Sequence, residues 1–304
     1  MSENTYSSYL HLDQLLSAQD CATEADSELL FLTIHQAKEL WFKLMIHELE
    51  GARRALYAGD EMRAYKILSR VHQIQLVQIR TWDVLSTLSP TEFQVFRESV
   101  GRDGASGFQS VQNREIEFLL GEKQRIRSFD TGESVREVDV IAMHRDPAVQ
   151  ERLTRRCAEP SIYDAAIHLL SQRFPQSGIA PRPEQGGDYS DGRASDPAVF
   201  ATWKRIYDDQ GEYMSLFQLG ERLVDLEDAF RRWRFRHLTT VALVIVRYTR
   251  PGGPVGLRTL TQTHIHTHAH TRTHTRTHAH THTHTRTHTH THTHTHTHTH
   301  THTH

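Results

Sequence analysis

The sequence predicts an all-α fold, a bundle of long helices followed by a segment that cannot form a core. Apolar residues recur every three or four positions through most of the first 245 residues, which is the spacing of one helix face. Alternation typical of strands is weak throughout. From Thr261 onward the chain is a threonine–histidine repeat with almost no large apolar residue, so it can bury little surface. We therefore expect a helical domain over residues 1–253 and a disordered tail over residues 254–304.

Two long helices are predicted first, over residues 27–57 and 61–87, because each carries a broad apolar stripe at helical spacing. A new helix is expected to begin at Pro90 with Ser89 as its N-cap, since proline is well tolerated in the first helical turn. Three glycines within residues 101–107 predict a loop between this helix and the next.

The middle of the chain is expected to be a series of shorter helices. Helix resumes through Leu120, and Gly121 stands where a C-cap glycine belongs. Residues 122–145 are charged and mixed, and they favour no single element. A loop rich in proline, glycine, serine and aspartate follows over residues 175–192. The remaining short helices are expected over residues 147–157, 161–173 and 197–209.

The last predicted helix carries one histidine on an otherwise apolar stripe. The stripe consists of Leu219, Leu223, Leu226, Phe230, Trp233, His237, Val241 and Val244. An imidazole that points into an apolar interior must be hydrogen-bonded, ligated or held neutral. The spacing alone favours a satisfied core histidine. The alternative is an axial ligand to a buried flat cofactor such as haem, whose iron takes a neutral imidazole.

Composition narrows the class of protein and its partners. The 35 basic side chains are outnumbered by 37 acidic ones, which gives no reason to expect a nucleic-acid partner. The sequence holds no apolar run of about 18 residues, so no membrane span is expected. Cys21 and Cys157 form no disulfide framework, and the N-terminus has no signal-peptide pattern. A reducing, cytoplasmic location is the simplest expectation.

The tail has the pattern of a translated DNA repeat. Every even position from 264 to 304 is histidine or arginine, and the odd positions are threonine except at Ile265, Ala269 and Ala279. A CA dinucleotide repeat read in one frame gives alternating threonine and histidine codons, and each exception is one base change away. The alternative is a genuine histidine-rich metal-binding tail. In either case its imidazoles could bind Ni²⁺ or Zn²⁺ adventitiously.

Five segments of the sequence together resemble the tryptophan 2,3-dioxygenase family. They occur in the family's order and cover about residues 5 to 250. The segments are Tyr6–Leu16 (YSSYLHLDQLL), Phe31–Trp41 (FLTIHQAKELW), Pro90–Arg97 (PTEFQVFR), Ser106–Ser110 (SGFQS) and Trp233–His237 (WRFRH). Each alone is a weak signal, and their agreement makes the resemblance specific.

The resemblance implies a fold, a reaction and an assembly. The fold would be a haem-binding helical bundle of the tryptophan/indoleamine dioxygenase type, with one haem b per subunit of a homotetramer. The reaction would insert O₂ into the indole ring of L-tryptophan and give N-formyl-L-kynurenine, in the kynurenine pathway of tryptophan catabolism.

The resemblance also implies roles for individual residues. His237 would bind the haem iron, and Trp82 would contact the haem. His35 is the candidate catalytic residue, over the open face of the haem, where it would hydrogen-bond the indole N–H. The implied substrate-binding residues are Phe31, Leu32, Thr33, Ile34, His35, Phe93, Arg97, Ser106, Tyr6 and Tyr9.

The resemblance gives further detail for Arg97, Tyr6 and Tyr9. Arg97 would grip the substrate's carboxylate, as an arginine flanked by aromatic residues is suited to do. Tyr6 and Tyr9 would reach into the pocket of a neighbouring subunit. Taken without the resemblance, Arg97 is an ordinary surface residue, the two tyrosines belong to an ordinary N-terminal segment, and His35 is a packed core histidine.

One segment departs from the family pattern. Where the family has a Gly-Thr-Gly-Gly-Ser-Ser-Gly loop whose threonine contacts the substrate, this chain has Arg250–Gly256 (RPGGPVG), with Pro251 in the threonine's place. Proline offers neither a hydroxyl nor an N–H. Three hypotheses therefore stay open: an active dioxygenase, a haem-binding relative with impaired catalysis, and a helical interaction protein without a cofactor.

Overall fold

The computed structural model describes residues 5–100, 110–130, 135–190, 196–241 and 244. Contacts divide the chain into two units. The first comprises residues 1–128 and 137–254, and it holds all the helices described below. The second comprises residues 129–136 and 255–304. The tail lies outside the described residues, so its disorder and the domain boundary at residue 253 stay predictions.

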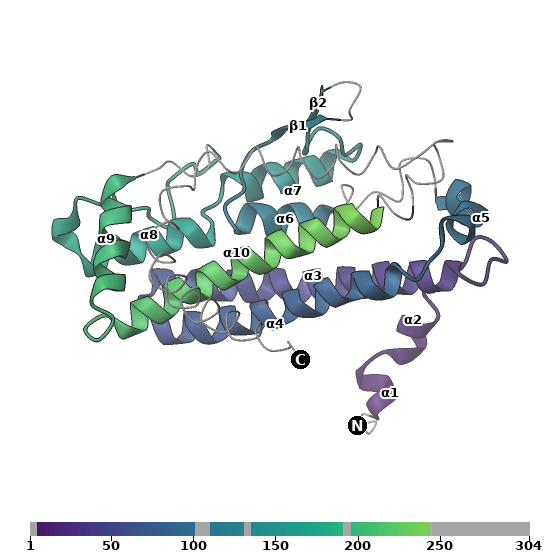
Figure 1. The fold of residues 1–304 in the computed structure, drawn as a ribbon, viewed down its shortest axis with the longest axis horizontal. Helices are drawn as coiled ribbons and strands as arrows, with labels where there is room; N and C mark the ends of the chain where they lie inside the picture. Colours follow the sequence, from purple (N-terminus) through teal and green to yellow (C-terminus); the bar gives the residue numbers. More distant parts are fainter. Residues whose placement is uncertain (1–4, 101–109, 131–134, 191–195, 242–243, 245–304) are drawn as a thin grey trace, which may run out of the picture. The chain divides into compact units, whose positions relative to one another are not determined.

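A long helical hairpin forms the centre of the first unit. Helix α3 (Glu28–Tyr57) is joined to helix α4 (Glu61–Leu85) by three residues (Figure 1). Gly59 adopts a left-handed conformation with φ +71°, which glycine reaches without strain. Asp60 then caps α4, because its carboxylate accepts a hydrogen bond from the backbone N–H of Arg63 at 3.0 Å. These bounds confirm the two long helices that the apolar spacing predicts.

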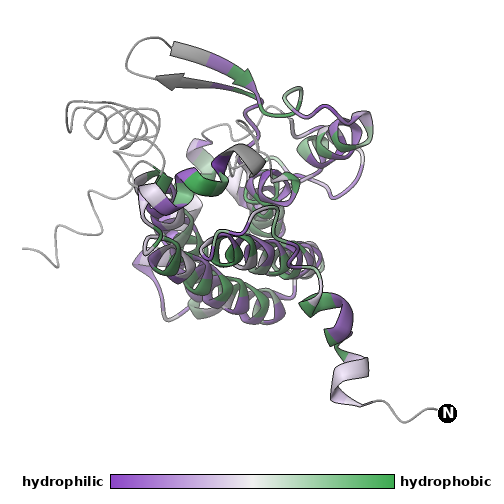
Figure 2. Cartoon of the chain, turned by 90° about the vertical axis from the view of Figure 1, so that its right-hand side faces the viewer, coloured by the Kyte–Doolittle hydropathy of each residue, from purple (hydrophilic) through white to green (hydrophobic). Residues whose placement is uncertain are grey.

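Other helices pack against both members of this hairpin. Helix α10 (Met214–Val241) runs along α4, while α6 (Val111–Leu119) and α8 (Ile162–Arg173) pack on α3 (Figure 1). Helix α7 (Pro147–Ala158) packs on α6, and α9 (Pro197–Asp208) packs on α10. The helices of the bundle carry hydrophobic and hydrophilic residues side by side, as amphipathic helices do (Figure 2).

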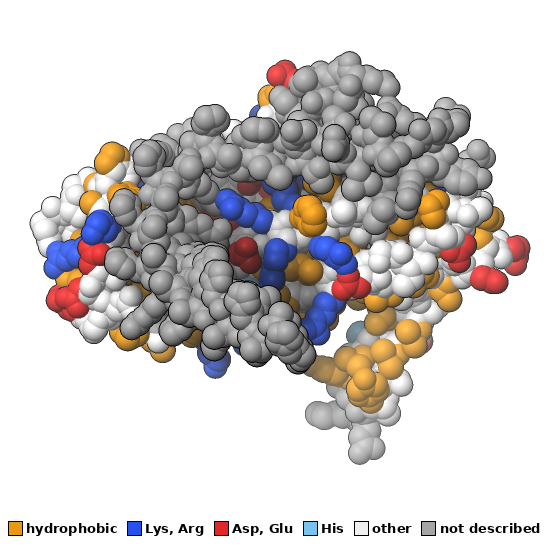
Figure 3. All heavy atoms as spheres, in the orientation of Figure 1, with side chains coloured by type: hydrophobic (Ala, Val, Ile, Leu, Met, Phe, Trp, Pro, Cys, Tyr) orange, Lys and Arg blue, Asp and Glu red, His pale blue; other side chains and the backbone are white. Residues whose placement is uncertain are grey.

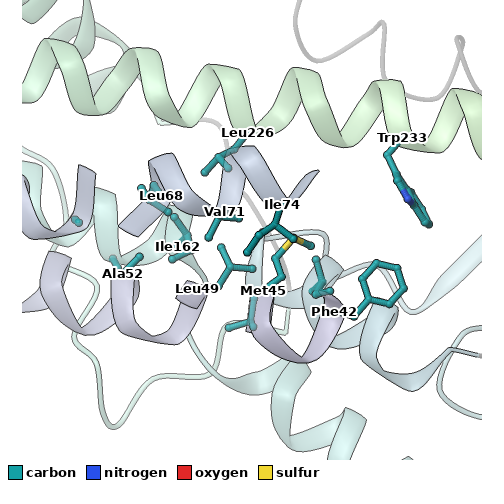
Figure 4. Close-up of a cluster of buried hydrophobic side chains, with 14 of the residues drawn as sticks. Phe42, Met45, Leu49, Ala52, Leu68, Val71, Ile74, Ile162, Leu226 and Trp233 are labelled. Carbon is teal, nitrogen blue, oxygen red and sulfur yellow. The ribbon is translucent and has the colours of Figure 1, made fainter. Parts of the chain in front are cut away.

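Apolar side chains from α3, α4, α8 and α10 meet in the core of this bundle (Figure 4). Leu49 of α3 and Leu68 and Val71 of α4 are fully buried. Burying each such side chain is worth roughly 1.5–3 kcal/mol, so this cluster fixes the two helices against each other. The other side chains labelled in the figure are Phe42, Met45, Ala52, Ile74, Ile162, Leu226 and Trp233.

Helix α10 separates its apolar stripe from a charged face, as the sequence predicts. Arg231 and Arg232 form ion pairs with acidic residues one turn earlier on α10, and Arg236 pairs with Asp83 of α4. Basic side chains gather near the middle of the face drawn in Figure 3. The charged face therefore stays in solvent while the stripe that contains His237 turns inward.

Local capping positions the helices that follow the hairpin. Helix α5 (Pro90–Val100) begins at Pro90, and Ser89 Oγ accepts a hydrogen bond from the backbone N–H of Glu92. Gly121, just beyond the end of α6, has φ +93°. Both positions confirm the sequence-based expectation.

Residues 122–145, which favour no element in the sequence, contain two short strands. Strands β1 (Ile126–Asp130) and β2 (Val135–Asp139) form a two-stranded sheet. Each strand is only five residues long and mixes charged with apolar side chains, so the sequence signal is weak. A 3₁₀ turn, η2 (Pro175–Ser177), lies in the predicted loop over residues 175–192.

The N-terminal segment exposes apolar side chains. Helices α1 (Tyr6–Tyr9) and α2 (Leu12–Leu16) contain no buried residue. Tyr6 is 77% exposed, Tyr9 is 72% exposed and Leu16 is 70% exposed. In the described part of the chain, no helix is both long enough and apolar enough to cross a membrane.

Candidate active site

A pocket lies between the long helices at the end of the bundle that carries His35 and His237. The space between its lining side chains amounts to about 640 Å³ when the part that is open to solvent is counted. The residues that line it are Phe31, His35, Lys38, Glu39 and Phe42 from α3; Trp82 and Leu85 from α4, and Leu88 just beyond it; Phe93 from α5; Ser110 and Asn113 at the start of α6; and Trp233, His237, Thr240, Val241 and Val244 from α10 and the residues after it.

His237 is held in this pocket by two tryptophans. Its ring stacks on Trp82 of α4, with centroids 4.8 Å apart and an interplanar angle of 17°. Trp233 lies one turn earlier on α10, and its ring centroid is 5.4 Å from that of His237. Burial lowers the pKa of His237 to about 3, with help from the positive charge of Lys38 and from His35. The imidazole is therefore neutral at physiological pH, as a metal ligand must be.

His35 presents an unprotonated ring nitrogen. Its Nδ1 lies 2.7 Å from the backbone oxygen of Phe31, and because a carbonyl can only accept, Nδ1 carries the proton. Nε2 therefore keeps its lone pair. Burial lowers the pKa of His35 to about 4, so this neutral form is the one present near pH 7. The Phe31 ring packs on the imidazole at a centroid distance of 4.1 Å and fixes its orientation.

Lys38 is a buried amine in the same pocket. Its side chain comes from α3, one turn after His35, and the residue is only 4% exposed. Nζ lies over the Trp82 ring, 2.8 Å from its centroid, and has no hydrogen-bond partner among the described residues. Burial lowers the pKa of Lys38 to about 6. Desolvation therefore makes this charge unfavourable in the folded protein.

We expect Lys38→Met to stabilise the haem-free protein by roughly 1–3 kcal/mol near pH 7, the usual range for a buried polar group without a partner. The folded-state pKa of about 6 lies below the ordinary value of 10.5, so the unfolded chain binds the extra proton between these values. Wild-type stability should then rise from pH 6 to pH 10.5, and that of the variant should rise less. Urea unfolding at several pH values in this range measures how steeply the free energy of unfolding rises with pH. The matched control is Lys43→Met, at an exposed position of α3. Equal slopes in all three proteins would contradict the prediction.

The structure brings together five of the residues that the sequence singles out. Phe31, His35, Trp82, Phe93 and His237 all line the pocket. They come from four different helices, which only the tertiary fold places side by side.

The run between Phe31 and His35 does not line the pocket. Leu32 is half-buried, Thr33 is exposed, and Ile34 is buried in the hydrophobic core. Residues four apart share a helix face, whereas the residues between them point elsewhere. The geometry therefore supports pocket contact for Phe31 and His35 and gives none for Leu32, Thr33 and Ile34.

Of the remaining candidates, those that the structure describes do not line the pocket. Arg97 is half-buried in the last turn of α5 and is not among the lining residues. Tyr6 and Tyr9 are exposed on α1. Ser106 and Pro251 lie outside the described residues. The roles of all five residues stay predictions.

Sequence reasoning missed Lys38, Glu39 and Asn113, which also line the pocket. The helical offset from His35 was a usable signal for the first two, because positions three and four residues later lie on the same face. Gln112 of α6 donates a hydrogen bond to a carboxylate oxygen of Glu39 at 2.7 Å. This contact ties α6 to α3 beside the pocket.

An all-α bundle whose long helices line a mainly apolar pocket with two neutral histidines has the architecture of a helical enzyme with its active site between the helices. The family model described as tryptophan 2,3-dioxygenase matches residues 1–157. The chain is similar to the tryptophan 2,3-dioxygenase of Bradyrhizobium sp. strain BTAi1, at 40% identity over 84% of this chain and 86% of that protein. It is 41% identical to that of Erythrobacter litoralis, over 83% of this chain and 90% of that protein. The enzyme of Pseudomonas fluorescens is 38% identical over 84% of each chain.

The chain belongs to the tryptophan 2,3-dioxygenase family. A match over 84% of 304 residues necessarily includes the helix that carries His237. The family named from the five sequence segments is thereby confirmed, together with the all-α fold.

Proposed function

We propose that this protein is a haem-dependent dioxygenase that inserts O₂ into the indole ring of L-tryptophan to give N-formyl-L-kynurenine. The observation that carries this proposal is the pocket in which His237 and His35, on separate helices, both present neutral imidazoles. Family membership supports the reaction class, and the pocket supports the chemistry.

The donor chemistry of the pocket suits one haem b per subunit, because a neutral imidazole lies there among apolar and aromatic side chains. His237 would bind the iron, and the stacked ring of Trp82 together with the tilted ring of Trp233 would hold the ring of His237 in place. Among the described residues, no group of three or more His, Cys, Asp or Glu side chains could hold a metal ion. A single imidazole suffices for iron that a porphyrin already holds. When bound, the haem supplies a ferrous iron with an open position for O₂.

The chain's own residues would orient the substrate. His35 Nε2 keeps its lone pair and so can accept a hydrogen bond from the indole N–H, which is only a donor. A neutral indole N–H is a very weak acid, so this hydrogen bond would position the ring rather than remove its proton. Phe31 and Phe93 form apolar walls beside His35, with ring centroids 5.7 Å apart, and would exclude water from the indole.

We propose that Arg97 anchors the substrate's carboxylate, and Arg97→Lys tests this role. Lysine keeps the charge but loses the planar fork, so L-tryptophan binding should weaken by roughly 1.5–3 kcal/mol. Tryptamine has no carboxylate and should bind the variant and the wild type almost equally. Substrate-induced shifts of the haem spectrum measure both affinities. Equal losses for the two ligands would place Arg97 elsewhere.

We also propose the family's homotetramer and its cytoplasmic location for this chain. The exposed Tyr6 and Tyr9 support the assembly, because an aromatic segment without buried residues has free surface to offer a neighbouring subunit. Adventitious Ni²⁺ or Zn²⁺ binding by the tail stays a prediction.

Reconstitution with haem followed by an activity assay tests the proposed function. A Soret band at one haem per chain, with kynurenine-type absorbance growing in the presence of L-tryptophan and O₂, would support it. A Soret band without turnover would favour a haem-binding relative with impaired catalysis. The proline at position 251, in place of the family's threonine, would then explain the loss of activity. Absence of a Soret band would favour a helical protein without this cofactor.

A further inference from the structure

Three buried N–H donors in the pocket have no acceptor among the described residues. They are Lys38 Nζ, Trp82 Nε1 and Trp233 Nε1. Lys38 lies over the Trp82 ring, and the two indole rings are 5.8 Å apart between centroids. Trp233 projects from α10 toward the part of α3 that carries Phe42 (Figure 4). Indole N–H groups donate and cannot accept, and Lys38 Nζ lies over the face of the Trp82 ring, so these three groups do not satisfy one another.

The neighbouring acidic side chains are engaged elsewhere. Glu39 lines the pocket, but its carboxylate accepts a hydrogen bond from Gln112. Glu117 of α6 is held by Arg114 and Arg127. None of the ion pairs within the described residues includes Lys38. A lysine is rarely buried without an anion, so the missing acceptor is expected on the molecule that fills the pocket.

We propose that Lys38 Nζ, together with the indole N–H groups of Trp82 and Trp233, binds a carboxylate of the pocket's occupant. This inference rests on the proposed function, whose two ligands each carry carboxylates: the haem propionates and the amino-acid end of tryptophan. The position favours a propionate. Trp82, which Lys38 covers, also stacks on the candidate iron ligand His237.

The rate of haem loss from the reconstituted protein tests whether the bound carboxylate is a haem propionate. Wild type, Lys38→Met and the exposed control Lys43→Met are loaded with haem or with haem dimethyl ester, whose propionates are uncharged. Transfer to an acceptor apoprotein is then followed. Loss of a charge-assisted hydrogen bond should speed haem release from Lys38→Met by about 10- to 100-fold. The ester should leave all three proteins at similar rates. Lys38→Arg should restore slow haem release, and circular dichroism confirms that each variant is folded.

The affinity for L-tryptophan tests whether the bound carboxylate is that of the substrate. Unchanged haem release in Lys38→Met, combined with about tenfold weaker L-tryptophan binding and unchanged tryptamine binding, would assign the carboxylate to the substrate and support the proposal. Two results would overturn it. One is equal haem release and equal ligand binding in all variants. The other is a low-spin ferric spectrum that becomes high-spin in Lys38→Met with haem and ester alike, which would make the amine an iron ligand. A wild type without a Soret band would instead refute the proposed function itself.

Discussion

His237→Ala is expected to abolish tight haem binding while the protein keeps its helical content. In the folded chain this imidazole is neutral, buried and stacked on Trp82, so it is ready to bind iron without first losing a proton. Alanine removes the only ligand to the iron that we assign to the protein. The variant should therefore purify and reconstitute with little bound haem, and dioxygenase activity should fall with it. Soret absorbance per chain and circular dichroism measure the two quantities.

Rescue by a small molecule distinguishes a lost ligand from a lost fold. Exogenous imidazole can enter the space left by the truncated side chain, so it should restore part of the Soret band of His237→Ala. The matched control is His47→Ala, which removes an exposed histidine of α3 and should bind haem as the wild type does. Full haem stoichiometry in His237→Ala without added imidazole would refute the assignment.

The fold was largely predictable because long amphipathic helices have apolar residues at regular helical spacing in the sequence. Both members of the α3–α4 hairpin, and the stripe that buries Trp233, follow from apolar residues repeating on one face. The caps at Ser89 and Gly121 depend only on the local sequence and were equally predictable. Strands β1 and β2 could not be predicted, because each has only five residues of mixed polarity and shows too little apolar–polar alternation.

The candidate site was predictable only in part, because it depends on contacts between helices. His35 and His237 were named from family-like segments, and the pocket contains both. The segment that contains His35 also suggested Leu32, Thr33 and Ile34, but the helix turns these three side chains away from the pocket. Nothing in the sequence showed that a lysine on α3 would lie over a tryptophan on α4. That contact exists only once the hairpin has folded.

Helix α6, which supports one wall of the pocket, is anchored by a buried ionic cluster. Glu117 accepts a hydrogen bond from Arg114 at 2.6 Å and pairs with Arg127 at 2.8 Å. The Arg114 and Glu117 side chains are each only 3% exposed. Burial alone would raise the pKa of Glu117, but Arg114, Arg127 and Arg234 together lower it below its ordinary value of 4.5. Its charge is therefore stabilised only while these cations stay in place.

Glu117→Ala is accordingly expected to destabilise the protein by about 3–5 kcal/mol at neutral pH, since removing one partner leaves buried guanidinium groups without their anion. The folded-state pKa lies below the ordinary value, so the carboxylate's contribution is present above pH 4.5 and is lost as the pH falls through its folded-state pKa. Wild-type stability should therefore drop in this acidic range more steeply than that of the variant. Urea unfolding of the haem-free protein at several pH values measures both effects. Asp208→Ala, which breaks an exposed pair with Lys204, is the control and should change stability by no more than about 0.5 kcal/mol. A loss in Glu117→Ala as small as in this control would mean that the buried cluster does not hold α6 in place.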